Sequence, residues 1–252
     1  MTALADVLGS FGIFLIGIVI RLLVFVAVLA AIALPVLAGM ALASRFSALR
    51  RRLLGLGQAG DVSYRDGLLY APSHTWLMPK GERLRIGLDA LAARLVPDAS
   101  AVALPRPGDA VSRGATLAEV TTGHRRLAVR SPIDGRVRFV NRRLAGHPER
   151  AERDPYVGGW LVEVEPTASG GLFLWGEKAR TWLATEASRF ERELEHGHGL
   201  AAADGGAPQL DLVKALPDQE WATLAASVVG SQAGEEAAWT TLPSAPSSAR
   251  TR

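Results

Sequence analysis

A long apolar run near the N-terminus most constrains what this chain can fold into. Residues 11–43, FGIFLIGIVIRLLVFVAVLAAIALPVLAGMALA, are apolar apart from Arg21. As a helix, residues 22–43 alone would extend for roughly 33 Å, about the thickness of the hydrocarbon core of a bilayer. The run therefore predicts one transmembrane helix within a membrane anchor of residues 1–52. A cleaved signal peptide is the alternative, but no positive charge precedes the run, which is also too long for one.

The charged residues beside this run predict its orientation. No Lys or Arg precedes Arg21, whereas Arg45 and three arginines at positions 50–52 follow the run. By the positive-inside rule, we expect the rest of the chain to face the cytoplasm from the inner membrane. We expect the side chain of Arg21 to reach the membrane interface, and a buried charge that pairs with an acid of a partner is the alternative.

The composition and the motifs exclude several classes of function. The chain has 252 residues and no cysteine, which excludes disulfides, thiolate metal sites and cysteine nucleophiles. Its 28 Lys and Arg residues barely outnumber its 25 Asp and Glu residues, and the arginines are spread along the chain without a nucleic-acid-binding motif. Hydrolase, nucleotide-binding and zinc-peptidase motifs are also absent. We therefore expect neither an enzyme nor a nucleic-acid partner nor a bound metal.

Short apolar runs follow the anchor. Residues 53–67 are polar and rich in glycine, and we predict that they form a linker. The later runs LRIGL, SAVALP, TLAEV, RLAVR, RVRFV and WLVEVEP are separated by Gly, Pro and Asp, as is typical of an antiparallel β-sandwich or barrel. In RVRFV, Val137 and Phe139 alternate with Arg136 and Arg138, so we expect the two apolar residues to be packed. Residues 89–96 predict a short helix.

Several motifs occur in a recognisable order between residues 70 and 166. They are YAPSHTW, LPRPGDAVSRGATLAEV, SPIDGRV, and Asn141 followed by HPERAERDPYVGGWLVEVEP. In order and spacing they resemble the motifs of the glycine cleavage system H protein, the lipoyl carrier of that complex. The resemblance implies a mainly β fold over residues 68–168, an H-protein or lipoyl-like antiparallel β-sandwich (barrel-sandwich hybrid). One transmembrane helix would precede this domain, and amphipathic α-helices would follow it.

The chain departs from this family at one position that matters for function. The resemblance places the family's lipoylated lysine at His124 and the acidic residue three positions earlier at Thr121. Lysine occurs only at Lys80, Lys178 and Lys214. A lipoyl amide requires a primary amine at the tip of a tight hairpin, and Lys80 falls in a different predicted turn. The resemblance therefore implies the fold but argues against a lipoyl cofactor, and we expect no cofactor.

The predicted hairpin tip holds the candidate binding residues. His124, Arg125 and Arg126 are candidates for binding an acidic partner surface, a phosphate or a lipid headgroup, because guanidinium groups suit such anions. A solvated turn without further function is the alternative. We expect His74 to be packed and hydrogen-bonded rather than a ligand. The histidines at 196 and 198 form only a weak metal pattern, because no third ligand has a defined spacing.

The C-terminal part predicts two helices and a tail. In LFLWGEKARTWLATEASRFERELEH, residues 172–196, Trp175, Ala179, Leu183 and Phe190 fall close to one helical face. We expect this stripe to pack on the sandwich, and docking to a partner is the alternative. A second short helix is predicted to begin near Asp218. Residues 169–230 thus form a helical extension, and residues 231–252 are predicted to be disordered.

Together these features predict a membrane-anchored, non-lipoylated, H-like protein. We expect a non-catalytic adaptor or subunit of a membrane-associated assembly that handles redox or lipoyl-dependent chemistry. Its anchor would raise its effective concentration beside a protein partner. Two alternatives stay open: a functional lipoyl carrier of the glycine cleavage system, and a transport adaptor of the membrane-fusion type.

Overall fold

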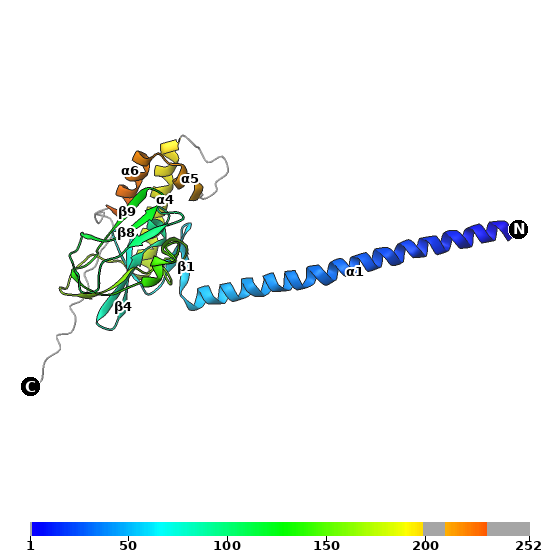
Figure 1. Cartoon of the computed structure of the whole chain (residues 1–252), viewed down its shortest axis with the longest axis horizontal. Coiled ribbons are helices and arrows are strands. Elements are labelled where there is room, and N and C mark those ends of the chain that lie inside the picture. The colour runs from blue at the N-terminus through cyan, green and yellow to red at the C-terminus, as the bar shows by residue number, and fades with distance from the viewer. Residues whose placement is uncertain (1, 199–209, 231–252) are drawn as a thin grey trace, which may run out of the picture. The chain divides into compact units, whose positions relative to one another are not determined.

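The computed structural model describes residues 2–198 and 210–230, and it divides the chain into two compact units (Figure 1). The units are Met1–Leu54 and Gly55–Arg252. The tail predicted to be disordered, residues 231–252, lies outside the described residues.

The first unit is a single long helix, α1, Thr2–Leu53. Within it, the 26 residues Arg21–Phe46 have a mean hydropathy of 2.8, and none of the most apolar window is buried. By length and composition this helix is able to cross a membrane. It extends further at both ends than the apolar run itself, and Pro35 lies inside it. Crossing of a membrane and orientation remain predictions.

The second unit contains antiparallel strands in two main sheets. The six-stranded sheet has the order β3 (Leu69–Ala71), β4 (Thr75–Lys80), β5 (Arg83–Leu88), β11 (Val162–Pro166), β10 (Gly135–Val140), β7 (Ala110–Val111). The three-stranded sheet has the order β6 (Ala101–Ala103), β8 (Thr116–Thr122), β9 (Arg125–Arg130). Short helical segments lie between strands: α2 (Ala90–Ala93), the 3-10 turn η1 (Arg142–Ala145) and α3 (Arg150–Arg153).

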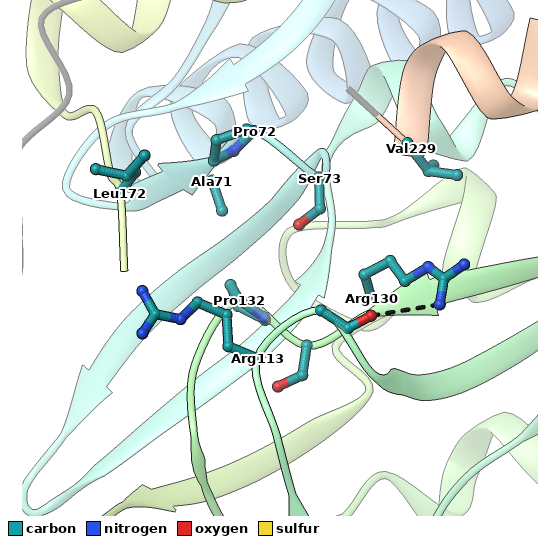
Figure 2. Close-up of a pocket in the computed structure, with 11 residues that line it drawn as sticks. Ala71, Pro72, Ser73, Arg113, Arg130, Pro132, Leu172 and Val229 are labelled. Atoms are coloured by element: carbon teal, nitrogen blue, oxygen red, sulfur yellow. Dashed lines mark hydrogen bonds between the residues drawn. The ribbon is translucent and has the colours of Figure 1, made fainter. Parts of the chain in front are cut away.

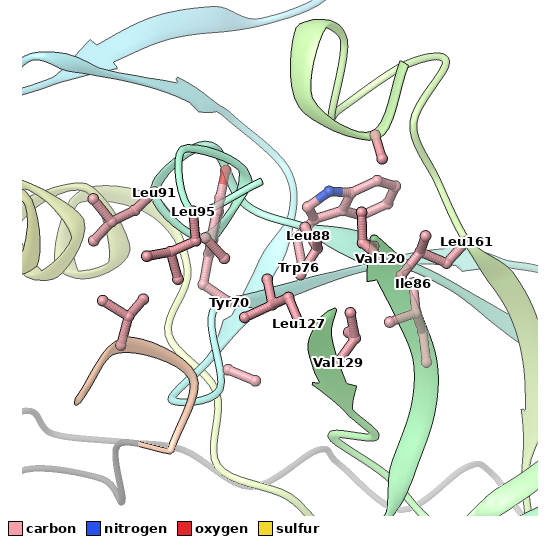
Figure 3. Close-up of a cluster of buried hydrophobic side chains, with 14 of the residues drawn as sticks. Tyr70, Trp76, Ile86, Leu88, Leu91, Leu95, Val120, Leu127, Val129 and Leu161 are labelled. Carbon is pink, nitrogen blue, oxygen red and sulfur yellow. The ribbon is translucent and has the colours of Figure 1, made fainter. Parts of the chain in front are cut away.

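The core lies where side chains from these two sheets meet. Trp76 and Ile86 of the larger sheet and Val120, Leu127 and Val129 of the smaller one belong to one buried cluster (Figure 3). In β9, the alternate residues Leu127 and Val129 are buried, as expected for a strand with one packed face. The prediction of a mainly antiparallel β fold is confirmed.

The predicted linker is wrong, because residues 55–67 are part of the folded domain. They form a hairpin of β1 (Leu56–Ala59) and β2 (Val62–Arg65). Val62 and Tyr64 are buried, and the Tyr64 ring stacks on that of Tyr70 with 5.2 Å between the ring centroids. The Tyr64 hydroxyl donates a hydrogen bond to the Gly176 carbonyl at 2.9 Å. The polar and glycine-rich composition gives no strand pattern here, because only two side chains of β2, Val62 and Tyr64, face the core.

The C-terminal helices pack against the sandwich. They are α4 (Gly176–His198), α5 (Leu210–Ala215) and α6 (Asp218–Val229). The apolar stripe of α4 is buried, which confirms the predicted packing; its members are Ala179, Leu183, Ala187, Phe190 and Leu194. Trp175 is an exception: it precedes the helix and is 52% exposed. Helix α6 begins at Asp218 as predicted, whereas α5 was not predicted.

One residue of β10 faces the opposite way from its prediction. The pairing of β10 with β11 shifts register between Val137 and Phe139. Such a β-bulge adds one residue to one strand and reverses the side-chain alternation beyond it. Val137 is therefore buried, whereas Phe139 is 52% exposed.

Candidate functional site

The hairpin of β8 and β9 carries the residues singled out from the sequence. Thr122 pairs with Arg125, so only Gly123 and His124 form the turn. Gly123 has a φ of +56°, a left-handed conformation that favours glycine. A Cβ atom at Gly123 would meet no atom within 4 Å, so the backbone conformation rather than lack of space requires glycine. The side chain of His124 is thereby placed at the extreme end of the hairpin.

An acidic residue of the C-terminal extension contacts this tip. His124 Nε2 lies 2.8 Å from each carboxylate oxygen of Asp218. Arg125 Nε donates to Asp218 Oδ1 at 3.0 Å. These two contacts hold the pKa of the Asp218 carboxyl below its ordinary value, the hydrogen bond from His124 first and that from Arg125 second. Asp218 is the first residue of α6, so the hairpin tip meets the start of this helix.

Arg125 also binds the end of α5. Its Nη1 donates to the Val213 carbonyl at 3.0 Å, and its Nη2 donates to the Leu216 carbonyl. The last carbonyls of a helix lack partners within the helix, and the guanidinium group supplies partners for two carbonyls here. Only 12% of the Arg125 side chain is exposed. We call these contacts of His124 and Arg125 with residues 213–218 the C-terminal clasp.

Helix α6 continues from the clasp along the hairpin. It contacts β9 and α4 (Figure 1), and it buries the side chains Trp221, Leu224, Ala225 and Val228. The Trp221 indole donates from Nε1 to the Leu95 carbonyl at 2.9 Å. The guanidinium carbon of Arg125 lies 5.6 Å from the Trp221 ring centroid. One helix thus packs beside the hairpin from its tip toward its base.

A hollow of about 450 Å³ lies at the base of the hairpin (Figure 2). Its walls include Ser73 from the β3–β4 turn, Arg130 and Pro132 from the end of β9, and Val229 from the end of α6. Arg130 Nη1 donates to the Gly114 carbonyl at 3.3 Å, the dashed line in the figure. The YAPSHTW and SPIDGRV motifs therefore meet at this hollow.

His74 forms a buried charge cluster that links the sandwich to α4. It is 0% exposed, and its Nδ1 lies 2.7 Å from Asp89 Oδ2. Asp89 Oδ1 also accepts hydrogen bonds from the backbone at the start of α2. On the other side, His74 Nε2 lies 3.8 Å from Glu186 Oε2 of α4, an ion-pair distance rather than a hydrogen bond. The imidazole also stacks on Trp182, with 4.8 Å between the ring centroids.

The surroundings of His74 decide its protonation. Burial alone would lower the pKa of His74, but the charge and hydrogen bond of Asp89, with a further contribution from Glu186, raise it to about 9. His74 also lowers the pKa of Glu186, against the effect of burial, which raises it. The cluster therefore contains a protonated histidine at neutral pH. The prediction that His74 is packed and hydrogen-bonded is confirmed.

The three candidate residues at the tip differ in how far their side chains are exposed to a binding partner. His124 is 73% exposed, and its side chain pairs with that of Asp218. Arg125 is held in the C-terminal clasp, and Arg126 is exposed on β9. Sequence reasoning missed Asp218 as their partner, because it lies 94 residues from His124. It missed Glu186 for the same reason. Among the described residues, no group of three His, Cys, Asp or Glu side chains is arranged to hold a metal ion.

The antiparallel sandwich, with its motif-bearing hairpin, defines a domain of the lipoyl-like class. The profile of the glycine cleavage H-protein family matches residues 68–173. The mitochondrial glycine cleavage system H protein of Pisum sativum is 36% identical over 122 residues, which cover 48% of this chain and 74% of that protein. The chain therefore belongs to the glycine cleavage H-protein family.

Other proteins of the family show similar matches. The H protein of Nitratidesulfovibrio vulgaris is 33% identical over 102 residues, covering 40% of this chain and 80% of that protein. A crystal structure of the H protein from Mycobacterium marinum superimposes with a TM-score of 0.44 at 26% identity, covering 48% of this chain and 99% of that one. The family profile begins at residue 68 and ends at residue 173, so α1 and the helices α4, α5 and α6 lie outside the matched domain.

Proposed function

We propose that this chain is a membrane-anchored, non-lipoylated member of the H-protein family that serves as a docking subunit rather than a carrier. The C-terminal clasp carries the proposal. The tip of the β8–β9 hairpin presents His124, and the neighbouring Arg125 joins the hairpin to Asp218 and to the end of α5. A carrier domain needs a tip from which an arm swings freely, and this tip is fastened to the rest of the chain.

The residues of the tip do not fit a lipoyl group. The resemblance to H proteins places the lipoylated lysine at His124, and an imidazole does not form a stable lipoyl amide. The lysines lie elsewhere: Lys80 ends β4, Lys178 is on α4, and Lys214 of α5 pairs with Asp98 at 2.5 Å. None of them replaces the amine at this tip. These residues support the docking role of the family but not its group-transfer chemistry.

The long helix α1 supports an anchor for this docking unit. Its apolar span and the basic flank that begins at Arg45 favour a single crossing of the inner membrane with the domain in the cytoplasm. An anchored domain meets a membrane-bound partner at a raised effective concentration, which suits a subunit of an assembly for redox or lipoyl-dependent chemistry. Reporter fusions after residue 52 test the orientation, and an external C-terminal side would contradict this part of the proposal.

A lipoylation assay tests the missing attachment site. The purified chain is incubated with a lipoate–protein ligase, ATP and lipoic acid, and its intact mass is then measured. The pea H protein controls for ligase activity, and a His124→Lys variant reports whether the hairpin itself is accessible to the ligase. We expect the mass of the unsubstituted chain to stay unchanged. A lipoyl-sized addition to it would contradict the proposal.

One observation favours a second candidate, a carrier that uses Lys80. Lys80 is exposed and immediately precedes the Gly81–Glu82 turn of the β4–β5 hairpin, so its amine also lies near a hairpin tip. The same assay separates the two candidates, because peptide mapping assigns any added lipoyl mass to a residue. Modification of Lys80, and its loss in a Lys80→Arg variant, would establish the carrier.

A further inference from the structure

The β-bulge of β10 exposes an aromatic side chain, Phe139, on the outer face of the six-stranded sheet. Because the alternation breaks between Val137 and Phe139, the consecutive side chains of Arg138 and Phe139 both face solvent. Bulges commonly re-aim a side chain at functional positions. Leaving a phenylalanine 52% exposed forgoes the stabilisation that its burial would give.

Two arginines of β5, which β11 separates from β10, stack on two aromatic rings of this face. The guanidinium carbon of Arg83 lies 4.5 Å from the ring centroid of Phe139, and that of Arg85 lies 4.5 Å from the ring centroid of Trp160. Glu163 accepts hydrogen bonds from Arg85 at 2.7 and 3.1 Å and pairs with Arg83 at 3.1 Å. Stacking and pairing hold the guanidinium groups of Arg83 and Arg85 over the two rings.

A hollow of about 470 Å³ lies beside these stacked groups. We call it the arginine hollow, and it is lined by Arg138, Phe139, Arg142, Arg143 and Trp160. The Asn141 amide holds the base of the hollow, because it donates to the Gly158 and Trp160 carbonyls at 2.9 and 2.7 Å.

The charges around the arginine hollow are unbalanced. Arg138 pairs with Glu165, and Glu163 pairs with the two stacked arginines. Arg142 and Arg143 are exposed, and within the described part of the chain neither has a carboxylate at ion-pair distance. Five arginines against two glutamates leave an excess of positive charge at a concave surface that also exposes an aromatic ring.

We propose that the arginine hollow is a docking surface for an acidic segment of a partner protein, with carboxylates that pair with Arg142 and Arg143 and an apolar side chain that covers Phe139. This inference rests on the proposed docking function and gives it a surface and a class of partner. The charge complementarity is specific: guanidinium groups bind carboxylates through two parallel hydrogen bonds, and arginine and aromatic residues dominate binding energy at protein interfaces.

The shape and charge of the surface favour a protein segment over an anionic membrane. The hollow is concave, whereas a membrane presents a broad surface to long side chains that remain mobile. The carboxylate of Glu165, whose side chain is 39% exposed, lies among the arginines and would repel a continuous layer of anionic headgroups. A peptide can place its carboxylates beside Arg142 and Arg143 and away from Glu165.

Peptide binding to the full-length chain in nanodiscs of neutral phosphatidylcholine tests this surface. The probe is a fluorescein-labelled peptide of alternating glutamate and leucine, and a matched peptide has glutamine in place of each glutamate. Fluorescence anisotropy gives Kd at low and at physiological salt. The variants are Arg143→Glu, Phe139→Ser, and Arg180→Glu as the matched control. Arg180 is exposed on α4, where it pairs only with Glu177 among the described residues, and its reversal changes the net charge equally.

We expect the acidic peptide to bind more weakly as salt rises and the glutamine peptide not to bind. Arg143→Glu should weaken binding about tenfold and Phe139→Ser about fivefold, as for residues central to an interface. Arg180→Glu should change Kd less than twofold. The proposal is overturned if Arg180→Glu weakens binding as much as Arg143→Glu does, or if the acidic peptide does not bind at low salt.

Two further results distinguish this inference from membrane binding and from the proposed function. Binding of phosphatidylserine vesicles that depends on Arg143, without peptide binding, would overturn it in favour of a membrane surface. Failure of peptide binding in a chain that carries no lipoyl group would remove this surface but leave the proposed function standing. A lipoyl group on the native protein would remove the proposed function, whatever the peptide does.

Discussion

The buried His74 cluster makes the stability of the folded domain depend on pH in a definite direction. The folded pKa of about 9 lies above the ordinary value of 6.5. A group whose pKa is raised by folding stabilises the folded state fully below its unfolded pKa, and this contribution is lost as the pH rises through the folded pKa. The contribution of His74 is therefore complete below about pH 6.5 and is lost by about pH 9.

The size of this effect follows from the pKa difference. One pKa unit corresponds to about 1.4 kcal/mol, so a rise from 6.5 to about 9 corresponds to about 3 kcal/mol. The free energy of unfolding should fall by up to about 1.4 kcal/mol per pH unit within this window. A His74→Gln variant should be less stable at pH 6 by about 3 kcal/mol, because Asp89 and Glu186 lose their buried cationic partner.

Urea denaturation in mild neutral detergent, followed by tryptophan fluorescence between pH 6 and 9.5, measures both effects. His147→Gln is the control, since His147 is 60% exposed and pairs at the surface with Glu149. The control should keep the pH slope of the unsubstituted chain, and His74→Gln should flatten it. An equal slope in His74→Gln would show that His74 is not the titrating group and would refute the reasoning.

Three other substitutions test the packing and the clasp. Trp221→Ala should lower the free energy of unfolding by about 3–5 kcal/mol, because it removes a buried indole, and limited proteolysis should then cut residues 210–230 first. Gly87→Ala should cost about 1–3 kcal/mol, since its Cβ would lie 2.6 Å from the Trp76 ring, whereas Gly146→Ala meets nothing within 4 Å and should have little effect. Asp218→Asn should increase hydrogen exchange at the β8–β9 hairpin near neutral pH. The lowered pKa of Asp218 implies that the unsubstituted clasp persists at neutral pH and loosens only in acid, as the carboxyl is protonated.

A specific result would contradict each of these three predictions. A loss below 1 kcal/mol in Trp221→Ala would mean that α6 contributes little to the fold. Equal stability of the two glycine variants in urea would contradict the close packing at Gly87. Unchanged hydrogen exchange in Asp218→Asn would show that Asp218 does not hold the hairpin tip.

The elements that sequence predicts best are those with a strong local pattern. Apolar runs or apolar residues at helical spacing predict helices α1, α4 and α6. Helix α6 begins at its predicted residue, whereas α1 extends beyond the apolar run 11–43 at both ends. The short apolar runs predict strands β5, β6, β8, β9, β10 and β11. The β1–β2 hairpin was missed because a glycine-rich segment contributes few side chains, among them Val62 and Tyr64, to the core.

Local sequence patterns do not predict the structure where one residue breaks the side-chain alternation of a strand or where segments distant in sequence meet. The bulge in β10 exposes Phe139, and nothing in RVRFV shows on which residue the register shifts. The candidate site depends on still longer separations. Asp218 lies 94 residues from His124, and Glu186 contacts His74 only because α4 packs on the sandwich. Such contacts are set by tertiary packing, which single-sequence periodicity does not encode.

The central claim is that this H-family chain works without a lipoyl group, and the intact mass of the native protein tests it most directly. The protein is purified in mild detergent from the membranes of its own cells, and the proteins that co-purify are identified in the same experiment. The account predicts the unmodified mass together with a defined protein companion. A lipoyl-sized addition, whether on Lys80 or elsewhere, would contradict the account and establish the chain as a carrier.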